Sequence, residues 1–196
     1  ILGALYFINN INEDDLVKRC RRALWGNTAL FLVFFLAFVI RTLLADGYAV
    51  RPETGEVFME PYKYLTNFLQ MPVVLLVFLV GVVAVLWGII RTLWKPAFDK
   101  GIWFAGAGTV LTVLALLLVA GYNNTAYYPS THDLQSSLTL ANSCSSQFTL
   151  KVMAYVSILV PFVLAYIFYA WRSIDNRKID AKELSLIHIS EPTRPY

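Results

Sequence analysis

The stretch PVVLLVFLVGVVAVLWGII, residues 72–90, contains no charged residue. As a helix rising about 1.5 Å per residue, it is long enough to cross the roughly 30 Å hydrocarbon core of a bilayer. Three further runs share this length and apolar character: Leu24–Ala45, Ile102–Val119 and Val152–Trp171. Backbone in lipid must satisfy its own hydrogen bonds, so each run predicts a helix. The sequence therefore predicts an all-α, polytopic membrane helix bundle with four transmembrane helices.

The composition agrees with a membrane protein rather than a soluble domain. Of 196 residues, 58% are hydrophobic and 15% charged, whereas soluble domains carry about 25% charged residues. The net charge of +3 does not indicate a nucleic-acid partner, because the basic residues lie in short segments beside the apolar runs.

The distribution of these basic residues predicts the topology. Cytoplasmic loops of membrane proteins are enriched in Lys and Arg. The long connections 46–71 and 121–151 are poor in both and are expected to face outward, so both ends of the chain are expected in the cytoplasm. Three basic clusters mark the cytoplasmic side: Lys18, Arg19, Arg21 and Arg22; Arg91, Lys95 and Lys100; Arg172, Arg177, Lys178 and Lys182.

The four runs offer little chemistry of their own. They contain no acidic residue and no His, and Arg41 is their single basic residue. We interpret Arg41 as an interfacial side chain that snorkels outward or pairs with Asp46, in preference to a buried functional arginine. A b-type haem needs axial His or Met ligands, and Met153 alone cannot supply them. We assign no catalytic, cofactor-binding or metal-ligating residue.

His132 and Asp133 in the second outer loop are the remaining candidates for a metal ligand or proton donor. No second His or Cys follows at ligand spacing, so we favour a solvated loop pair. The same loop mixes Ser and Thr with apolar residues and predicts one or two short helices in the outer interface. Cys20 and Cys144 fall on opposite sides of the predicted bilayer, which excludes a disulfide between them.

Several local features refine the helices. The acidic start and basic end of residues 13–19 predict a short helix at the cytoplasmic membrane surface. Small residues in the third run predict a helix-packing surface. Pro161 predicts a kink in the last helix, with Ser157 placed to compensate a freed carbonyl. The small residues are Gly101, Ala105, Gly106, Ala107 and Gly108.

Both ends of the sequence change character. Residues 1–23 predict the last turns of a preceding transmembrane helix followed by a cytoplasmic basic segment, and residues 24–184 the four-helix domain. The final stretch SLIHISEPTRPY, residues 185–196, has no periodicity, and we interpret it as a non-native, adapter-derived tail.

Three segments carry a family resemblance: Asp46-Gly47-Tyr48, the opening Gly3-Ala4-Leu5-Tyr6, and SSLTLANSCSSQFTLKVM at residues 136–153. They resemble subunit II of the cytochrome bd-type quinol oxidases. In the last segment, a Ser/Thr-rich turn precedes a final helix interrupted by proline. The resemblance runs through residues 1–184 and identifies the chain with the C-terminal half, helices five to eight, of an eight-helix subunit.

The resemblance implies a terminal respiratory oxidase of the bacterial inner membrane that oxidises quinol and reduces oxygen to water. Haem b and haem d are then expected in the partner subunit I, and none on this chain. Further expected partners are the N-terminal half of the same subunit, small accessory subunits, quinol and lipid. Without these partners we expect poor independent assembly. The alternatives are half of an inverted-repeat secondary transporter and a four-span scaffold unrelated to respiration.

Overall fold

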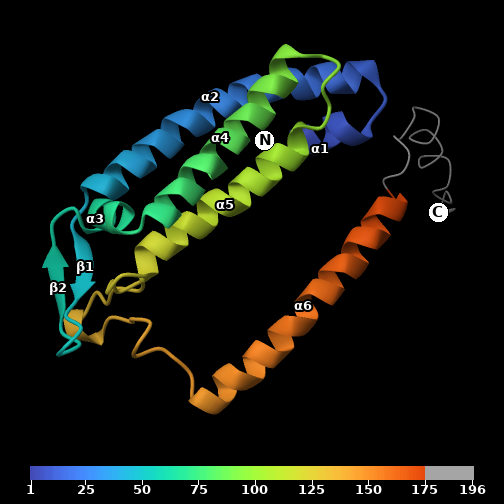
Figure 1. The fold of residues 1–196 in the computed structure, drawn as a ribbon. Coiled ribbons are helices and arrows are strands. Elements are labelled where there is room, and N and C mark those ends of the chain that lie inside the picture. Colours follow the sequence, from blue (N-terminus) through green and yellow to red (C-terminus); the bar gives the residue numbers. More distant parts are fainter. Residues whose placement is uncertain (175–196) are drawn as a thin grey trace, which may run out of the picture.

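The computed structural model describes residues 1–174, and four helices in this part are long and apolar enough to cross a membrane. They confirm the predicted all-α bundle (Figure 1). A short helix, α1, precedes them at Leu2–Asn10. The predicted tail at residues 185–196 lies outside the described residues. The four long helices are α2 (Asp14–Leu44), α4 (Pro72–Trp94), α5 (Gly101–Gly121) and α6 (Gln147–Ile174).

Helix α2 differs from the expectation at its charged start. The predicted separate surface helix at residues 13–19 is wrong, because α2 runs without interruption from Asp14 to Leu44. No proline interrupts this stretch, and Lys and Arg are good helix formers. The charged turns also have tertiary support, since Val17 and Cys20 pack against the buried cluster that contains Leu24.

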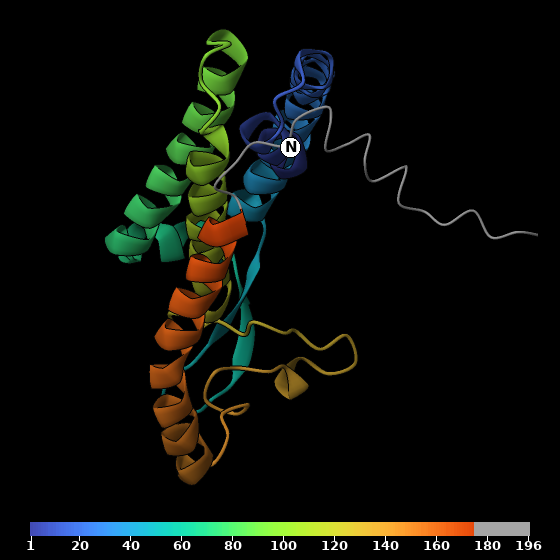
Figure 2. The ribbon, with the colours of Figure 1, turned by 90° about the vertical axis from the view of Figure 1, so that its right-hand side faces the viewer.

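Helices α4 and α5 form a closely packed antiparallel pair (Figures 1 and 2). Helix α4 begins at Pro72, as predicted, where the missing N–H costs nothing. A Cβ on Gly81 would lie 2.9 Å from the carbonyl oxygen of Gly108, and one on Gly88 would lie 2.7 Å from that of Gly101. These backbones approach so closely that only glycine fits.

The predicted small-residue packing surface on α5 is therefore confirmed for Gly101, Ala105 and Gly108, with two corrections. The buried residues recur every three or four positions along one helix face, and neither Gly106 nor the exposed Ala107 is among them. A Cβ added to Gly106 would meet nothing within 4 Å, so this glycine faces away from α4. The buried face consists of Gly101, Ala105, Gly108, Thr112, Ala115 and Val119.

Helix α1 packs where the basic ends of α2, α4 and α5 meet. Its Leu5 and Ile8 are buried together with Leu24, Ile89 and Ala105. The guanidinium of Arg21 joins α2 to the end of α4. It donates to the carbonyl oxygens of Thr92 and, at 2.8 Å, of Pro96. The Thr92 carbonyl lies in the last turn of α4, at the negative end of the helix dipole, so a cation there is stabilising.

The opposite end of the bundle carries a cap of β-strands and loops. Strands β1 (Gly47–Val50) and β2 (Val57–Glu60) form an antiparallel hairpin in which Val50 pairs with Val57. Gly55 lies at φ +72° in its turn, a conformation that favours glycine. Helix α3, Lys63–Gln70, follows the hairpin. The loop after α5 returns over β1 and contains one 3₁₀ turn, η1, Leu134–Ser136.

The loop between α5 and α6 is less helical than predicted, because the described structure holds the three-residue η1 where one or two interfacial helices were expected. Helix α6 then begins at Gln147, earlier than the predicted Val152. The helix is continuous through Pro161, and the Ser157 hydroxyl does not compensate the carbonyl freed by the proline. It donates to Met153 instead, at 2.8 Å.

Helix α6 stands apart from the other spans in Figure 1. All its side chains from Gln147 to Ser173 are exposed or, at one position, partly exposed. Near its end, the ring of Trp171 meets Tyr6 of α1 edge-on at 6.3 Å. A groove of about 530 Å³ lies between α1, α5 and α6. Its lining includes Ile102 and Leu164.

Candidate functional site

The cap concentrates the buried polar side chains of the described structure. Polar groups lose their water on burial and need internal partners. Each of these side chains therefore has to be accounted for by hydrogen bonds. Those in the cap are Lys63, Asn67, Thr125, Ser137 and Thr139.

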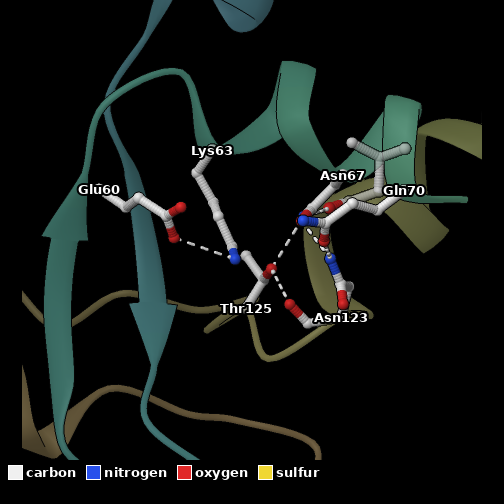
Figure 3. Close-up of polar contacts among 7 residues, drawn as sticks. Glu60, Lys63, Asn67, Gln70, Asn123 and Thr125 are labelled. Atoms are coloured by element: carbon white, nitrogen blue, oxygen red, sulfur yellow. Dashed lines mark hydrogen bonds and ion pairs between the residues drawn. The ribbon is translucent and has the colours of Figure 1, made fainter.

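Asn67 is the centre of the network drawn in Figure 3. Its side chain is fully buried. The amide nitrogen donates to the carbonyl oxygen of Val119 and to the Thr125 hydroxyl, both at 2.9 Å. Its amide oxygen accepts from the side chain of Asn123 at 3.0 Å, and Asn123 also donates to Gln70. Helix α3 is thereby fastened to the last turn of α5 and to the loop that follows.

Lys63 lies beside this network and is 7% exposed. Its ammonium group forms an ion pair of 3.1 Å with the Glu60 carboxylate at the end of β2. The Lys63 stem passes directly over Gly47, where a Cβ would lie 2.5 Å from the lysine Cβ. Burial raises the pKa of the neighbouring Tyr64 hydroxyl, and the Tyr48 phenol adds to this shift. Gly47 of the Asp46-Gly47-Tyr48 segment has no side chain, and this leaves room for the Lys63 side chain to pack against the backbone.

The loop after α5 is fixed to the hairpin by paired hydrogen bonds. Gln135 accepts from the backbone N–H of Val57 at 2.9 Å and donates to its carbonyl at 2.8 Å. Within the loop, Asn142 accepts from the N–H of Thr139 at 2.7 Å and donates to the carbonyl of Ser137 at 2.9 Å. The Ser/Thr-rich segment therefore forms an ordered turn, in which polar side chains are hydrogen-bonded to backbone groups.

His132 and Asp133 differ in their contacts, because only the Asp133 side chain caps η1. Both are exposed. A carboxylate oxygen of Asp133 accepts from the backbone N–H of Gln135 at 3.2 Å and caps η1. This capping bond gives Asp133 a structural function, in agreement with a loop pair. Across residues 1–174, no group of three or more His, Cys, Asp or Glu side chains is placed to hold a metal ion.

Arg41 and the two cysteines are also placed. Arg41 is exposed on α2, and no ion pair joins it to Asp46 among the described residues. The exposed position favours the interfacial interpretation over a buried functional arginine. Cys20 and Cys144 are both free thiols, Cys20 partly exposed and Cys144 exposed.

The described spans do not fit a haem. No histidine occurs in α2, α4, α5 or α6, and Met153 is exposed on α6. The cavity among α2, α4 and α5, of about 240 Å³, is lined almost entirely by apolar side chains. Its two hydroxyls, Thr109 and Thr112, donate to carbonyls of their own helix at 2.7 and 2.8 Å. Such a lining suits hydrocarbon.

Sequence reasoning missed the residues that organise the cap. Lys63 and Asn67 lie in a stretch read as a polar outer loop, and a polar residue signals its burial only through tertiary contacts. One signal was present: α3 has apolar residues at Leu65, Phe68 and Leu69, as an amphipathic helix requires. Its polar face holds Lys63 and Asn67.

These features define a multi-pass α-helical membrane protein with a folded extramembrane cap and a tightly packed central helix pair. The family model for cytochrome bd terminal oxidase subunit II matches residues 1–174, the whole of the described part. The chain belongs to this family.

Curated relatives agree. The cytochrome bd-I ubiquinol oxidase subunit 2 of Escherichia coli (strain K12) is 32% identical over 131 residues, which is 66% of this chain. The proteins of the same name from E. coli O157:H7 and O6:H1 (strain CFT073) align with the same identity and coverage. The match spans 33% of the length of each relative.

Proposed function

We propose that this chain acts within a cytochrome bd-type quinol oxidase as a non-catalytic membrane subunit. Subunit I would carry haem b and haem d, oxidise quinol and reduce oxygen to water. The observation that carries the proposal is the family match over residues 1–174, because the matched relatives are named as subunits of a ubiquinol oxidase.

The arrangement of α6 supports a role in assembly. Its apolar side chains are exposed along the whole described length, including Phe162 at 71% and Tyr169 at 74%. Lipid covers apolar side chains without penalty, and shape-matched packing is what holds helices together in a bilayer. We infer that α6 and the groove beside it receive helices of subunit I or of the same subunit.

We also propose an orientation. The basic ends of α2, α4 and α5 face the cytoplasm, and the cap of β1, β2 and α3 faces outward. The positive-inside rule supports this assignment. The cap then lies on the side where the family oxidises quinol, and its hydrogen-bonded loops give the outer face of the complex a fixed surface.

The test is co-purification from a host that lacks its own bd oxidase. The full-length subunit that contains this chain is tagged and expressed with subunit I, and a reduced-minus-oxidised spectrum of the purified complex is recorded. Haem d and haem b bands together with quinol-dependent oxygen uptake are expected. Subunit I expressed alone with the same tag is the matched control. A stable, haem-free tagged product would overturn the proposal and favour a transporter.

A further inference from the structure

Helix α2 is longer than a bilayer span, and the turns that extend beyond the apolar part carry charged residues. Its 31 residues extend about 46 Å at 1.5 Å per residue, compared with roughly 30 Å of hydrocarbon. The apolar part begins at Leu24, so the turns from Asp14 to Ala23 extend into the headgroup region. The fold keeps these turns helical, which fixes the spacing of their side chains.

The four bases in these turns divide into two kinds. Arg21 faces the bundle and donates to carbonyls at the end of α4. Arg19 and Arg22 are exposed, and neither has a hydrogen bond or ion pair with any residue from 1 to 174. Lys18 has a loose contact of 4.0 Å with Asp15, and both of these side chains are largely exposed.

The exposed bases lie around a single centre. Side chains three and four residues apart are neighbours on a helix surface. Arg22 therefore has Arg19 and Lys18 on the turn before it and Trp25 on the turn after it. Like charges at this spacing repel each other, and an anion between them relieves that repulsion. Trp25 is 60% exposed, as expected of an interfacial tryptophan.

An apolar strip continues from this cluster into the membrane. Val33 and Leu36 follow Trp25 by eight and eleven residues, which is two and three turns along the same face. They are 65% and 55% exposed. A molecule with a negative head and a hydrocarbon chain can therefore contact bases and apolar surface at once.

We propose that Lys18, Arg19, Arg22 and Trp25 form a binding site for the phosphate group of an anionic phospholipid, with the acyl chain along Val33 and Leu36. The bases supply charge-assisted hydrogen bonds to phosphate oxygens. Charge complementarity selects an anionic over a zwitterionic lipid. The continuous apolar strip distinguishes a lipid from free phosphate and from an acidic protein surface.

The test uses the complete membrane complex that contains this chain, purified in mild detergent and titrated with phosphatidylglycerol under native mass spectrometry. Lys18→Gln with Arg22→Gln is compared with Lys95→Gln and Lys100→Gln, which removes the same charge at the same end of the bundle. Each base near an anionic surface contributes about fivefold in affinity. We expect the first pair to weaken phosphatidylglycerol binding roughly 25-fold and the second to leave it near wild type.

Two further variants sharpen the result. Arg22→Lys keeps the charge and is expected to retain most of the binding, while Trp25→Ala is expected to weaken phosphatidylglycerol binding and leave competition by inorganic phosphate unchanged. Equal losses in both glutamine pairs would reduce the site to diffuse charge attraction and overturn the proposal. Loss of a protein subunit from the Lys18/Arg22 variant, with the lipid still bound, would overturn it in favour of a protein contact.

Discussion

The side-chain nitrogen of Asn67 lies 2.9 Å from the carbonyl oxygen of Val119 and joins α3 to the last turn of α5. Val119 is itself buried, so its carbonyl has little access to water. One amide thus satisfies a carbonyl at the end of α5 and joins the cap to the helix bundle.

Replacing Asn67 with Ala should loosen the cap. The change removes both donated bonds and the bond accepted from Asn123. The buried Val119 carbonyl then loses its side-chain donor, at about 1–3 kcal/mol for a buried group left unsatisfied. We expect a lower thermal midpoint of the purified complex. Asn27→Ala is the control, because Asn27 is exposed on α2. Equal midpoints for the two variants would contradict a fastening role.

The ion pair between Lys63 and Glu60 should also contribute to stability. Glu60→Gln leaves the Lys63 ammonium buried without its counter-ion. Breaking a buried pair costs about 3–5 kcal/mol, and the partial exposure of Glu60 lowers this to about 1–3 kcal/mol.

The exposed pair of Arg51 and Glu56, with side chains 60% and 49% exposed, supplies the control. Glu56→Gln should change the free energy of unfolding by less than about 1 kcal/mol. The double variant Lys63→Met with Glu60→Gln should recover part of the loss, because no charge remains buried. A double variant less stable than Glu60→Gln alone would contradict this account.

Two glycines of α5 should respond in opposite ways to alanine. A Cβ on Gly108 would lie 2.5 Å from the carbonyl oxygen of Gly81 and 2.7 Å from the backbone nitrogen of Val85. Gly108→Ala should separate α4 from α5 and cost about 1–3 kcal/mol. Gly106→Ala meets open space and should gain about 0.5–1 kcal/mol from helix propensity. Denaturant titration of the purified complex measures both, and a neutral Gly108→Ala would contradict the observed packing.

The two free cysteines test the proposed orientation. In sealed cells, a membrane-impermeant maleimide should label a Cys20→Ser variant through Cys144, which is exposed in the loop that the proposed orientation places outside. A Cys144→Ser variant should remain unlabelled until the membrane is permeabilised. The reverse pattern would invert the topology.

Hydropathy predicted the four spans because helix formation in lipid depends on local composition. The predicted ends lie within about five residues of the observed ones, except at the start of α2, which begins ten residues before the predicted Leu24. The β1–β2 hairpin was missed, although Tyr48-Ala49-Val50 and Val57-Phe58-Met59 flank a turn with Pro52 and Gly55. These signals are short, and the hairpin is stabilised by a loop more than sixty residues later in the chain, through Ala126 and Gln135.

The packing surface of α5 was predicted from the number of small residues in the third run. The residues that actually pack are those that recur every three or four positions along the helix. Gly101, Ala105, Gly108 and Thr112 follow helical spacing and face α4, whereas Gly106 and Ala107 fall outside that spacing. Reading the period would have excluded both. The roles of Asn67 and Arg21 depend on partners more than fifty residues away in the sequence, so no local pattern could reveal them. Lys63 pairs with Glu60 only three residues away, but its burial depends on the close approach of Gly47.

The exposure of α6 has a consequence for how this sequence can vary. A mutational scan of α5 should find positions that accept only one or two small residues, because neighbouring backbone occupies the space. Along α6, the described chain imposes no such shape, and any apolar residue that preserves insertion satisfies it. Substitutions in α6 that are tolerated at some positions and not at others would therefore reveal where α6 contacts helices outside residues 1–174, whether they belong to subunit I or to the same subunit.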